Sequence, residues 1–394
     1  MSYAVGVIVF SVGLLVSIML HEVGHFSTAK AFGMKASRFF VGFGPTLWST
    51  RRGETEYGVK ALPLGGFVKI DGMTSLEPID PADEDRAFYK QPAAKRLVVL
   101  CAGSFVHFVI AIVLVFAVLA ATGEDPVRTD GLQVMTVSKC ITASGSGACK
   151  KDAPTAPAYG ILQTGDVVLA INGHKLDSSG ANFLSVLRNS PGKPVALTYQ
   201  RDGATRSATV TPVAFQVGKK VQGRIGVETE AHAAPVTVSG SFGRTFTLLG
   251  DFMSSTGSAI AGLPHEVGQI LSGGHRSDTS AASIVDVARV SGQIADSGAS
   301  FGSIVASLVL ILAELNLFVG LSNMLPLLPF DGGHVAILGF EEGRTRLYRV
   351  IGRRDPGRVD IMKVLPVTYA VFAVFVGLSL ILLYAGITNP ISLQ

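Results

Sequence analysis

The pentapeptide HEVGH, at residues 21–25, stands at the end of an uncharged apolar run that begins at the first residue. Residues four apart on a helix share a face, so His21 and His25 can bind one metal ion. Glu22 then lies beside that ion, where its carboxylate can take a proton from water. The pattern predicts a water-splitting metal centre inside a membrane helix, which suits a substrate that also lies in the membrane.

The composition supports a chain that crosses a membrane several times. Hydrophobic residues make up 48% of the 394 positions and charged residues only 16%. The net charge of +4 is small and dispersed, which argues against a nucleic-acid partner. A bilayer requires about 20 apolar residues per helix. Four regions meet this requirement, and we expect transmembrane helices within residues 1–34, 97–122, 301–334 and 364–388.

Lysine and arginine are concentrated in two of the connections, residues 35–96 and 335–363. Basic loops stay on the cytoplasmic side of a membrane. We therefore expect both termini to be extracytoplasmic, together with the long segment between the second and third helices. The histidine motif then lies toward the cytoplasmic side, and residues 335–363 are predicted to form a basic cytoplasmic loop.

The connection over residues 35–96 alternates as β-strands do, with candidate strands at 39–41, 55–59 and 66–70. A plain cytoplasmic hairpin is one interpretation of this small sheet. The other is a sheet edge, including Gly66 and Phe67, that binds an extended substrate through backbone hydrogen bonds. Peptide-bond cleavage needs an extended substrate, which favours the second interpretation.

Residues 127–230 are predicted to form a separate α+β domain, with short β-rich runs, hairpin turns at Asn172-Gly173 and Asp202-Gly203, and a helix over 179–189. The stretch from residue 159 to 173 resembles a PDZ domain. Such domains bind chain ends or extended segments, although a spacer with an empty groove is the alternative. Cys140 and Cys149 form either a disulfide, if this side is oxidising, or two free thiols.

Residues 231–300 contain two amphipathic patterns. These are expected to be either helices that cover the approach to the spans on the outer membrane surface, or linker helices.

A catalytic zinc ion takes three protein ligands and keeps one position open, so two histidines are not enough. Asp331 follows the third span at a depth that matches His21 and His25. Pro326 and Pro329 interrupt the helix just before it. Irregular backbone at this depth is tolerated only within protein or around a wet cavity. Asp331 is therefore the predicted third ligand.

Together the HEVGH motif, the segment 323–333 and the PDZ-like domain resemble the site-2 proteases, the bacterial intramembrane zinc metalloproteases, and most closely their actinobacterial members. The resemblance implies one Zn²⁺ per chain, held by His21, His25 and Asp331, with Glu22 as the base. It also implies that Asn323 steadies the substrate or the oxyanion. Its expected setting is the bacterial plasma membrane, and its expected substrates are single-span membrane proteins such as anti-sigma factors, cut first outside the membrane by another protease.

One departure from that family lies in the second span. Many relatives carry Gly-Pro-x-x-Asn there, whereas this chain has Gly103, Ser104 and His107 at the matching positions. His107 either donates a hydrogen bond near the site or is a packed core histidine. Glu314 is a second unusual residue, a carboxylate deep in the third span. We expect it to be protonated or hydrogen-bonded to a neighbouring span.

The predicted fold is thus a polytopic α-helical membrane protein of about four transmembrane helices, with a small membrane-associated β-sheet and an extracytoplasmic PDZ-like α+β domain. Two other functions fit parts of the pattern. A non-catalytic receptor would use a structural metal, but an intact Glu22 argues against it. A metal transporter would line a path across the membrane, whereas these ligands cluster at one end.

Overall fold

The computed structural model describes residues 2–73, 79–141, 149, 153–176, 180–217, 220–271, 282–354, 357–359 and 361–388. The chain divides into two compact units, which are described separately. The first combines Met1–Val118 with Gly243–Gln394, and the second is Leu119–Phe242.

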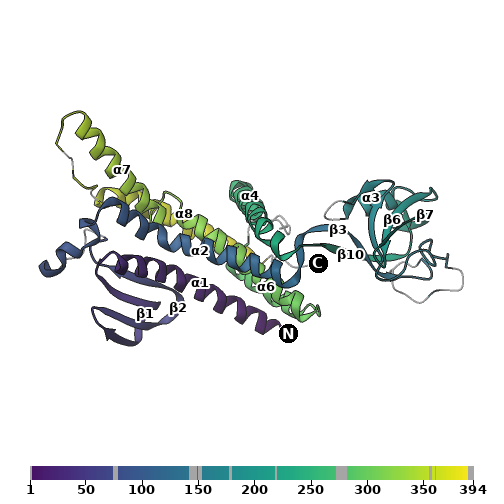
Figure 1. Cartoon of the computed structure of the whole chain (residues 1–394), viewed down its shortest axis with the longest axis horizontal. Coiled ribbons are helices and arrows are strands. Elements are labelled where there is room, and N and C mark those ends of the chain that lie inside the picture. Colours follow the sequence, from purple (N-terminus) through teal and green to yellow (C-terminus); the bar gives the residue numbers. More distant parts are fainter. Residues whose placement is uncertain are drawn as a thin grey trace. The chain divides into compact units, whose positions relative to one another are not determined.

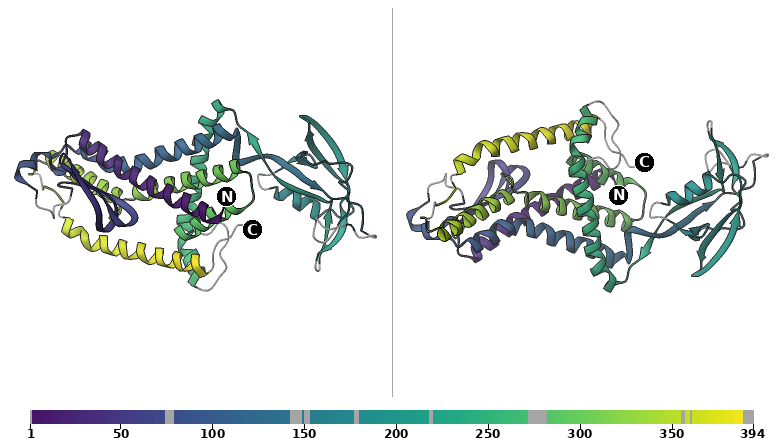
Figure 2. Two further views of the ribbon diagram at one scale, coloured as in Figure 1. Left: turned by 90° about the horizontal axis from the view of Figure 1, so that it is seen from below. Right: turned by 90° about the horizontal axis from the view of Figure 1, so that it is seen from above.

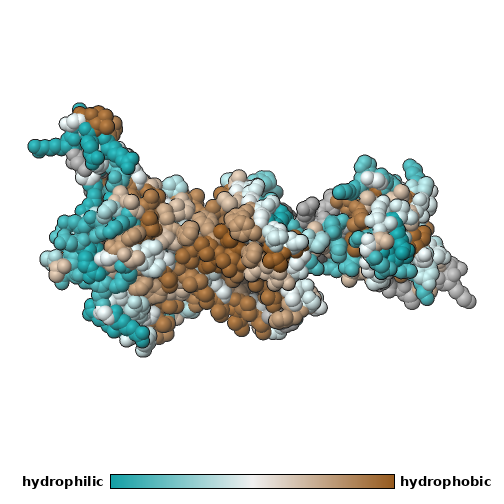
Figure 3. All heavy atoms as spheres, in the orientation of Figure 1, coloured by the Kyte–Doolittle hydropathy of each residue, from teal (hydrophilic) through white to brown (hydrophobic). Residues whose placement is uncertain are grey.

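The first unit is built on long apolar helices (Figure 1). Within the described ranges, four helices are long and apolar enough to cross a membrane, and apolar side chains cover the visible surface of α1, α2 and α6 (Figure 3). The predicted class, a polytopic α-helical membrane protein, is confirmed. These helices are α1 (Tyr3–Ala31), α2 (Ala93–Thr122), α6 (Phe301–Asn323) and α8 (Ile361–Thr388).

Small residues let α1 approach its neighbours closely. A Cβ atom on Gly24 would lie 2.7 Å from the carbonyl oxygen of Ala102 in α2. A Cβ atom on Gly6 would lie 2.3 Å from the carbonyl oxygen of Ser291 in α5 (Ile284–Asp296). Lipid tails are as apolar as leucine, so helices in a membrane associate largely through such close backbone packing. This packing places His21, Gly24 and His25 in the interior of the unit.

Two strands, β1 (Ala36–Arg52) and β2 (Thr55–Ile70), follow α1 and form an antiparallel two-stranded sheet. Both strands double back, so Phe39 pairs with Val68 on one side and with Tyr57 on the other (Figure 2). Gly42 and Gly65 occupy the bends with φ of +85° and +134°, a conformation that glycine adopts at little cost. The strands are longer than the three predicted pieces because these bends interrupt the alternating pattern.

Further helices complete the first unit. The 3₁₀ helices η1 (Pro81–Arg86) and η2 (Phe88–Lys90) precede α2, and α4 (Val238–Leu271) precedes α5. Helix α7 (Asp331–Val350) lies where the sequence predicted a basic loop over 335–363. That prediction was wrong about local structure, because residues 331–350 form one helix in which Leu338 is buried while Phe340 and Leu347, near the opposite side, are exposed.

The second unit is an α+β domain, as predicted for residues 127–230. Its main sheet has the order β10-β3-β4-β6-β7, with β5 paired to β4, and a separate hairpin joins β8 to β9. Leu132, Val168, Phe183 and Leu197 lie in its core. The strands are β3 (Glu124–Val137), β4 (Val167–Ile171), β5 (His174–Lys175), β6 (Val195–Arg201), β7 (Ala204–Val210), β8 (Val213–Val217), β9 (Lys220–Arg224) and β10 (Val227–Pro235), and the helix is α3 (Ala181–Arg188). The sulfur atoms of Cys140 and Cys149 are 2.02 Å apart, as in a disulfide.

Candidate metal centre

Three side chains from two distant parts of the chain converge inside the first unit. The Nε2 atoms of His21 and His25 are 3.1 Å apart, and each lies 3.3 Å from Oδ2 of Asp331. Helix geometry brings the two imidazoles together, whereas Asp331 arrives as the first residue of α7. Both histidines are buried. The structure therefore brings together the three residues predicted as ligands.

The donor atoms suit a cation of zinc's size. A point equidistant from the three atoms lies about 1.9 Å from each (mean edge divided by √3), close to the zinc bond lengths of about 2.0–2.2 Å to nitrogen and oxygen. Oδ2 of Asp331 is buried without a hydrogen-bond partner among the described residues. A buried carboxylate oxygen without a partner is costly unless a cation or a proton satisfies it. The residues therefore fit a zinc ion.

The hydrogen bonds of His25 also favour metal binding. Its Nδ1 atom lies 2.7 Å from the carbonyl oxygen of Val99 in α2. A carbonyl only accepts, so Nδ1 carries the proton. Neutral His25 then directs the lone pair of Nε2 toward His21 and Asp331, the arrangement usual for a metal-bound histidine.

Glu22 lies beside the metal-ligand triangle and is held by the sheet. The backbone N–H of Val68 in β2 donates to Oε2 of Glu22 at 3.0 Å. Residues 66–70 pair with β1 along one edge, and their other edge faces α1. Sequence reasoning identified Glu22 but missed Val68, because a backbone donor leaves no signal in residue type.

Space beside the imidazoles depends on a glycine in α2. A Cβ atom on Gly103 would lie 2.4 Å from Nε2 of His25 and 2.6 Å from Nε2 of His21. Any larger residue would therefore occupy the place where the two ligands meet. In the second span, the departures from the family pattern are at Ser104 and His107. The residue that lies against the two ligands is Gly103 itself.

The turn before α7 places Asp331. A Cβ atom on Gly332 would lie 2.3 Å from the carbonyl oxygen of Met324 and 2.4 Å from that of Leu325. Gly333 is similarly tight against Leu328, with a Cβ-to-N distance of 2.6 Å. The two glycines thus let α7 begin directly against the end of α6.

His107 belongs to a polar network behind His21. Its ring centroid is 5.0 Å from that of His21, and its Nδ1 lies 2.8 Å from Oδ1 of Asn316. The Asn316 amide nitrogen donates to Ser17 Oγ at 3.0 Å and to the Leu312 carbonyl at 2.7 Å. His107 therefore donates from Nδ1, and in its neutral form Nε2 is the acceptor. His107 is outside the group of atoms close enough to share one ion.

The remaining predicted residues lie in different settings. Asn323 is the last residue of α6 and is half-buried, and within the described ranges no hydrogen bond joins it to the three ligands. Gly66 packs against α1, since its Cβ would lie 2.5 Å from Met19 Sδ. Phe67 stacks on Phe40 with ring centroids 5.6 Å apart.

Glu314 was expected to be either protonated or hydrogen-bonded to a neighbouring span, and the described residues do not show the second arrangement. It is exposed on α6, and no hydrogen bond to a neighbouring span is found for it in the part of the chain that the structure describes.

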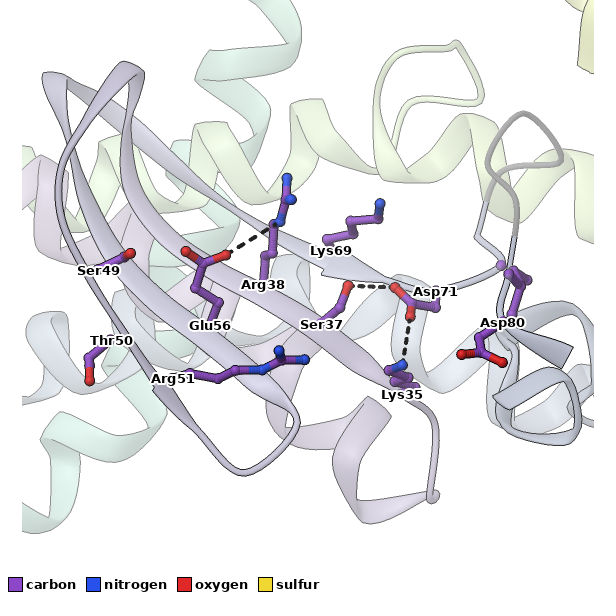
Figure 4. Close-up of a pocket in the computed structure, with 12 residues that line it drawn as sticks. Lys35, Ser37, Arg38, Ser49, Thr50, Arg51, Glu56, Lys69, Asp71 and Asp80 are labelled. Carbon is purple, nitrogen blue, oxygen red and sulfur yellow. Dashed lines mark hydrogen bonds and ion pairs between the residues drawn. The ribbon is translucent and has the colours of Figure 1, made fainter. Parts of the chain in front are cut away.

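A polar cavity of about 600 Å³ opens on the sheet side of the unit (Figure 4). Its charged side chains largely satisfy one another. Nε of Arg38 lies 3.7 Å from Oε2 of Glu56, and Nζ of Lys35 lies 3.9 Å from Oδ2 of Asp71. The other carboxylate oxygen of Asp71, Oδ1, accepts a hydrogen bond from the Ser37 hydroxyl at 2.5 Å. None of the three metal-ligating residues lines it. The cavity is therefore separate from the metal centre.

Comparison with known proteins agrees with this geometry. Residues 9–353 match Peptidase family M50. The zinc metalloprotease Rip1 of Mycobacterium tuberculosis (strain H37Rv) is 38% identical over the whole length of both chains, and Rip1 of Mycolicibacterium smegmatis is 35% identical over the same extent. The chloroplastic membrane metalloprotease ARASP of Arabidopsis thaliana is 27% identical over 92% of this chain and 75% of its own.

Among solved structures, a PDZ domain of an SdrC-like protein from Listeria monocytogenes is 25% identical over 27% of this chain and 93% of its own, with a TM-score of 0.20. The match to the peptidase family covers most of the chain, and it includes all three residues of the triangle. The chain belongs to peptidase family M50, the site-2 protease family, and is a zinc metalloendopeptidase.

Proposed function

We propose that this protein hydrolyses peptide bonds within or near the transmembrane segments of single-span membrane proteins. His21, His25 and Asp331 hold the zinc ion, and Glu22 is the general base. The observation that carries this proposal is the triangle of three donor atoms, 3.1–3.3 Å apart, set among helices apolar enough to span a membrane. A hydrolytic centre in that setting serves a substrate that reaches it from the bilayer.

The chemistry divides between the ion and the side chains. Bound zinc supplies a Lewis acid that polarises a carbonyl and makes water more acidic. Glu22 accepts the proton of the attacking water and then passes it to the leaving amine. Asn323, at the end of α6, is assigned a hydrogen bond to the substrate backbone or to the developing oxyanion. No covalent intermediate with the protein is required.

The outer edge of β2 is proposed to bind the substrate in an extended form. Residues 66–70 use one edge for β1, and the Val68 N–H points the other way, toward Glu22. An added strand would form backbone hydrogen bonds along this edge irrespective of its side chains. Gly66 and Phe67 fix its position, since Gly66 sits against Met19 of α1 and Phe67 stacks on Phe40. Strand addition places a scissile carbonyl next to the catalytic base.

The second unit is proposed to act as a filter for substrates. In this proposal it lies outside the cytoplasm with both termini, and excludes membrane proteins that retain a bulky external domain. Substrates such as anti-sigma factors would then enter only after another protease has removed that domain. The placement of basic residues in the connections 35–96 and 335–363 supports this orientation.

A cleavage assay with measured zinc content tests the catalytic proposal. The purified full-length protein in proteoliposomes should cut a labelled single-span peptide, and a zinc chelator should stop the reaction. Glu22→Gln should retain zinc but lose cleavage, because the ligands remain while the base is gone. Asp331→Ala should lose both. Full cleavage by Glu22→Gln, or normal zinc content in Asp331→Ala, would refute the assignment.

Deleting residues 127–230 tests the filter. We expect the shortened enzyme to cut an untrimmed substrate that the complete enzyme leaves intact. The trimmed substrate is the control and should be cut by both. If the shortened enzyme cuts the trimmed substrate but still ignores the untrimmed one, exclusion by size is the wrong explanation.

A further inference from the structure

Helix α7 has one face that the protein covers and one that it leaves exposed. On the covered face, Leu338 joins the buried cluster that contains Leu100 of α2. On the same side, Arg96 of α2 lies 3.6 Å from Glu341 and 3.5 Å from Glu342. These contacts fix which side of α7 packs against the unit.

The exposed face is apolar. Phe340, Leu347 and Val350 are 61%, 57% and 82% exposed, and Ile351, just after the helix, is 51% exposed. Positions 340, 347 and 351 repeat at helical spacing, so their side chains form a stripe along one face, interrupted by Gly343 and Arg344 between Phe340 and Leu347. Figure 3 shows hydrophobic atoms at the tip of α7, bordered by hydrophilic surface. Four large apolar side chains in one stripe are unusual on a surface that contacts only water.

The end of this stripe lies in an arginine-rich segment. The segment 343–354 contains no acidic residue and five arginines, at positions 344, 346, 349, 353 and 354. The guanidinium of Arg344 lies 5.5 Å from the centroid of the Phe340 ring, on the same face of the helix. An apolar face with arginines around it is typical of a helix that lies in a membrane interface, where each basic residue contributes about 1 kcal/mol of attraction to anionic lipid.

The position of α7 in the chain identifies what covers the stripe. It connects α6 to α8, two helices that can each cross a membrane, so it lies next to the lipid surface on whichever side that connection falls. We propose that the exposed face of α7 binds the lipid–water interface, with Leu347, Val350 and Ile351 inserted among the lipids and the surrounding arginines on anionic phosphate headgroups.

The lipid contact is also expected to affect the metal centre. This second expectation rests on the proposed function, whereas the lipid contact itself does not. Asp331 is the first residue of α7. A helix of this length is stiff, so a lipid contact near its C-terminal end limits how far the helix can tilt and how far Asp331 can move. Anionic lipid is therefore expected to increase zinc retention as well as to hold the stripe.

Spin labelling tests the lipid contact without any activity measurement. In full-length protein with the free Cys101 replaced by serine, Val350→Cys carries the label, and Lys193→Cys in the second unit is the water-exposed control. The protein is reconstituted in phosphatidylcholine, with or without phosphatidylglycerol. Two accessibilities of the label are measured, one to oxygen and one to a water-soluble nickel complex, and their ratio is higher for a label in lipid. We expect this ratio to rise at least about threefold at position 350 when the anionic lipid is present, and to stay unchanged at position 193.

A charge variant provides the second arm. Replacing Arg346, Arg349, Arg353 and Arg354 with glutamine should remove the dependence on phosphatidylglycerol while circular dichroism shows unchanged helix content. A label at 350 that stays equally open to nickel in both lipids would overturn the proposal. So would a lipid dependence that survives in the glutamine variant, or a label that is equally shielded in both lipids, since each removes the role assigned to the arginines.

Discussion

The backbone N–H of Val68 donates a hydrogen bond to the carboxylate of Glu22, with 3.0 Å between the nitrogen and Oε2. The bond joins the outer edge of β2 to the helix that carries both histidine ligands. A substrate strand added to that edge would use the same N–H for one of its carbonyl groups. Substrate binding and release of the base from the sheet are therefore expected to occur together.

Removing this donor tests the relationship. Val68→Pro lacks the N–H, yet the residue is at an outer edge where proline does not interrupt the pairing with β1. We expect kcat/KM to fall about tenfold, the equivalent of one lost hydrogen bond. Val68→Ala keeps the N–H and is the matched control. Equal activity of the two variants in the proteoliposome assay would contradict this role for the amide.

Gly103 provides a test of the space beside the ligands. In Gly103→Ala, the new methyl group would overlap Nε2 of both histidines, and a helix backbone cannot easily retreat. We expect zinc affinity to fall at least about tenfold, with cleavage falling in parallel. Gly377→Ala is the control, because that glycine lies in another apolar helix with no heavy atom within 4 Å of its Cβ. Unchanged zinc content in Gly103→Ala would show that the site relaxes around the methyl group.

Gly332 tests how the third ligand is placed. The Cβ of Gly332→Ala would press on two backbone carbonyl groups, of Met324 and Leu325, so the turn must open and Asp331 must move. A displacement of about 1 Å typically costs about 100-fold in kcat. Gly339→Ala, in the same helix but with open space around it, should leave activity unchanged. Similar kcat values for the two variants would contradict this account of the turn.

The second unit contains a buried ion pair whose contribution depends on pH. Asp166 is 1% exposed, and Arg201 donates to its two oxygens at 2.7 and 2.6 Å. Burial opposes ionisation of Asp166, but the hydrogen bonds from Arg201 and from the Gln163 amide outweigh it and lower the carboxyl pKa below its ordinary value of 3.8. A lowered pKa in the folded state means that the stabilisation is complete above about pH 4 and is lost as the pH falls further.

Asp166→Asn should therefore lower the free energy of unfolding by about 3 kcal/mol at neutral pH, because Arg201 loses its partner. The difference from the unmodified protein should shrink as the pH is lowered from 4 toward 2. Calorimetric unfolding of the full-length protein in detergent, at several pH values, measures both. A difference that stays constant across this range would mean that the ion pair is not its source.

Local sequence patterns were sufficient for the spans and for part of the site. The apolar runs predicted the four helices that can cross a membrane, and the spacing of His21 and His25 predicted a shared metal because both lie on one helix. Asp331 could be predicted because chain order and membrane depth place the end of the third span near the histidines. The helix α7 was missed because a count of basic residues hides the apolar stripe formed by Phe340 and Leu347.

The sequence by itself determined which residues can bind and activate water, because residue type and helical spacing are local properties. Only the tertiary structure decided what surrounds them: the Val68 amide on Glu22, the gap at Gly103, and the network from His107 through Asn316 to Ser17. These contacts join positions 46 to 299 residues apart. They depend on how closely helices and strand edges pack in the folded protein. A local sequence pattern does not predict the distance between such packed elements.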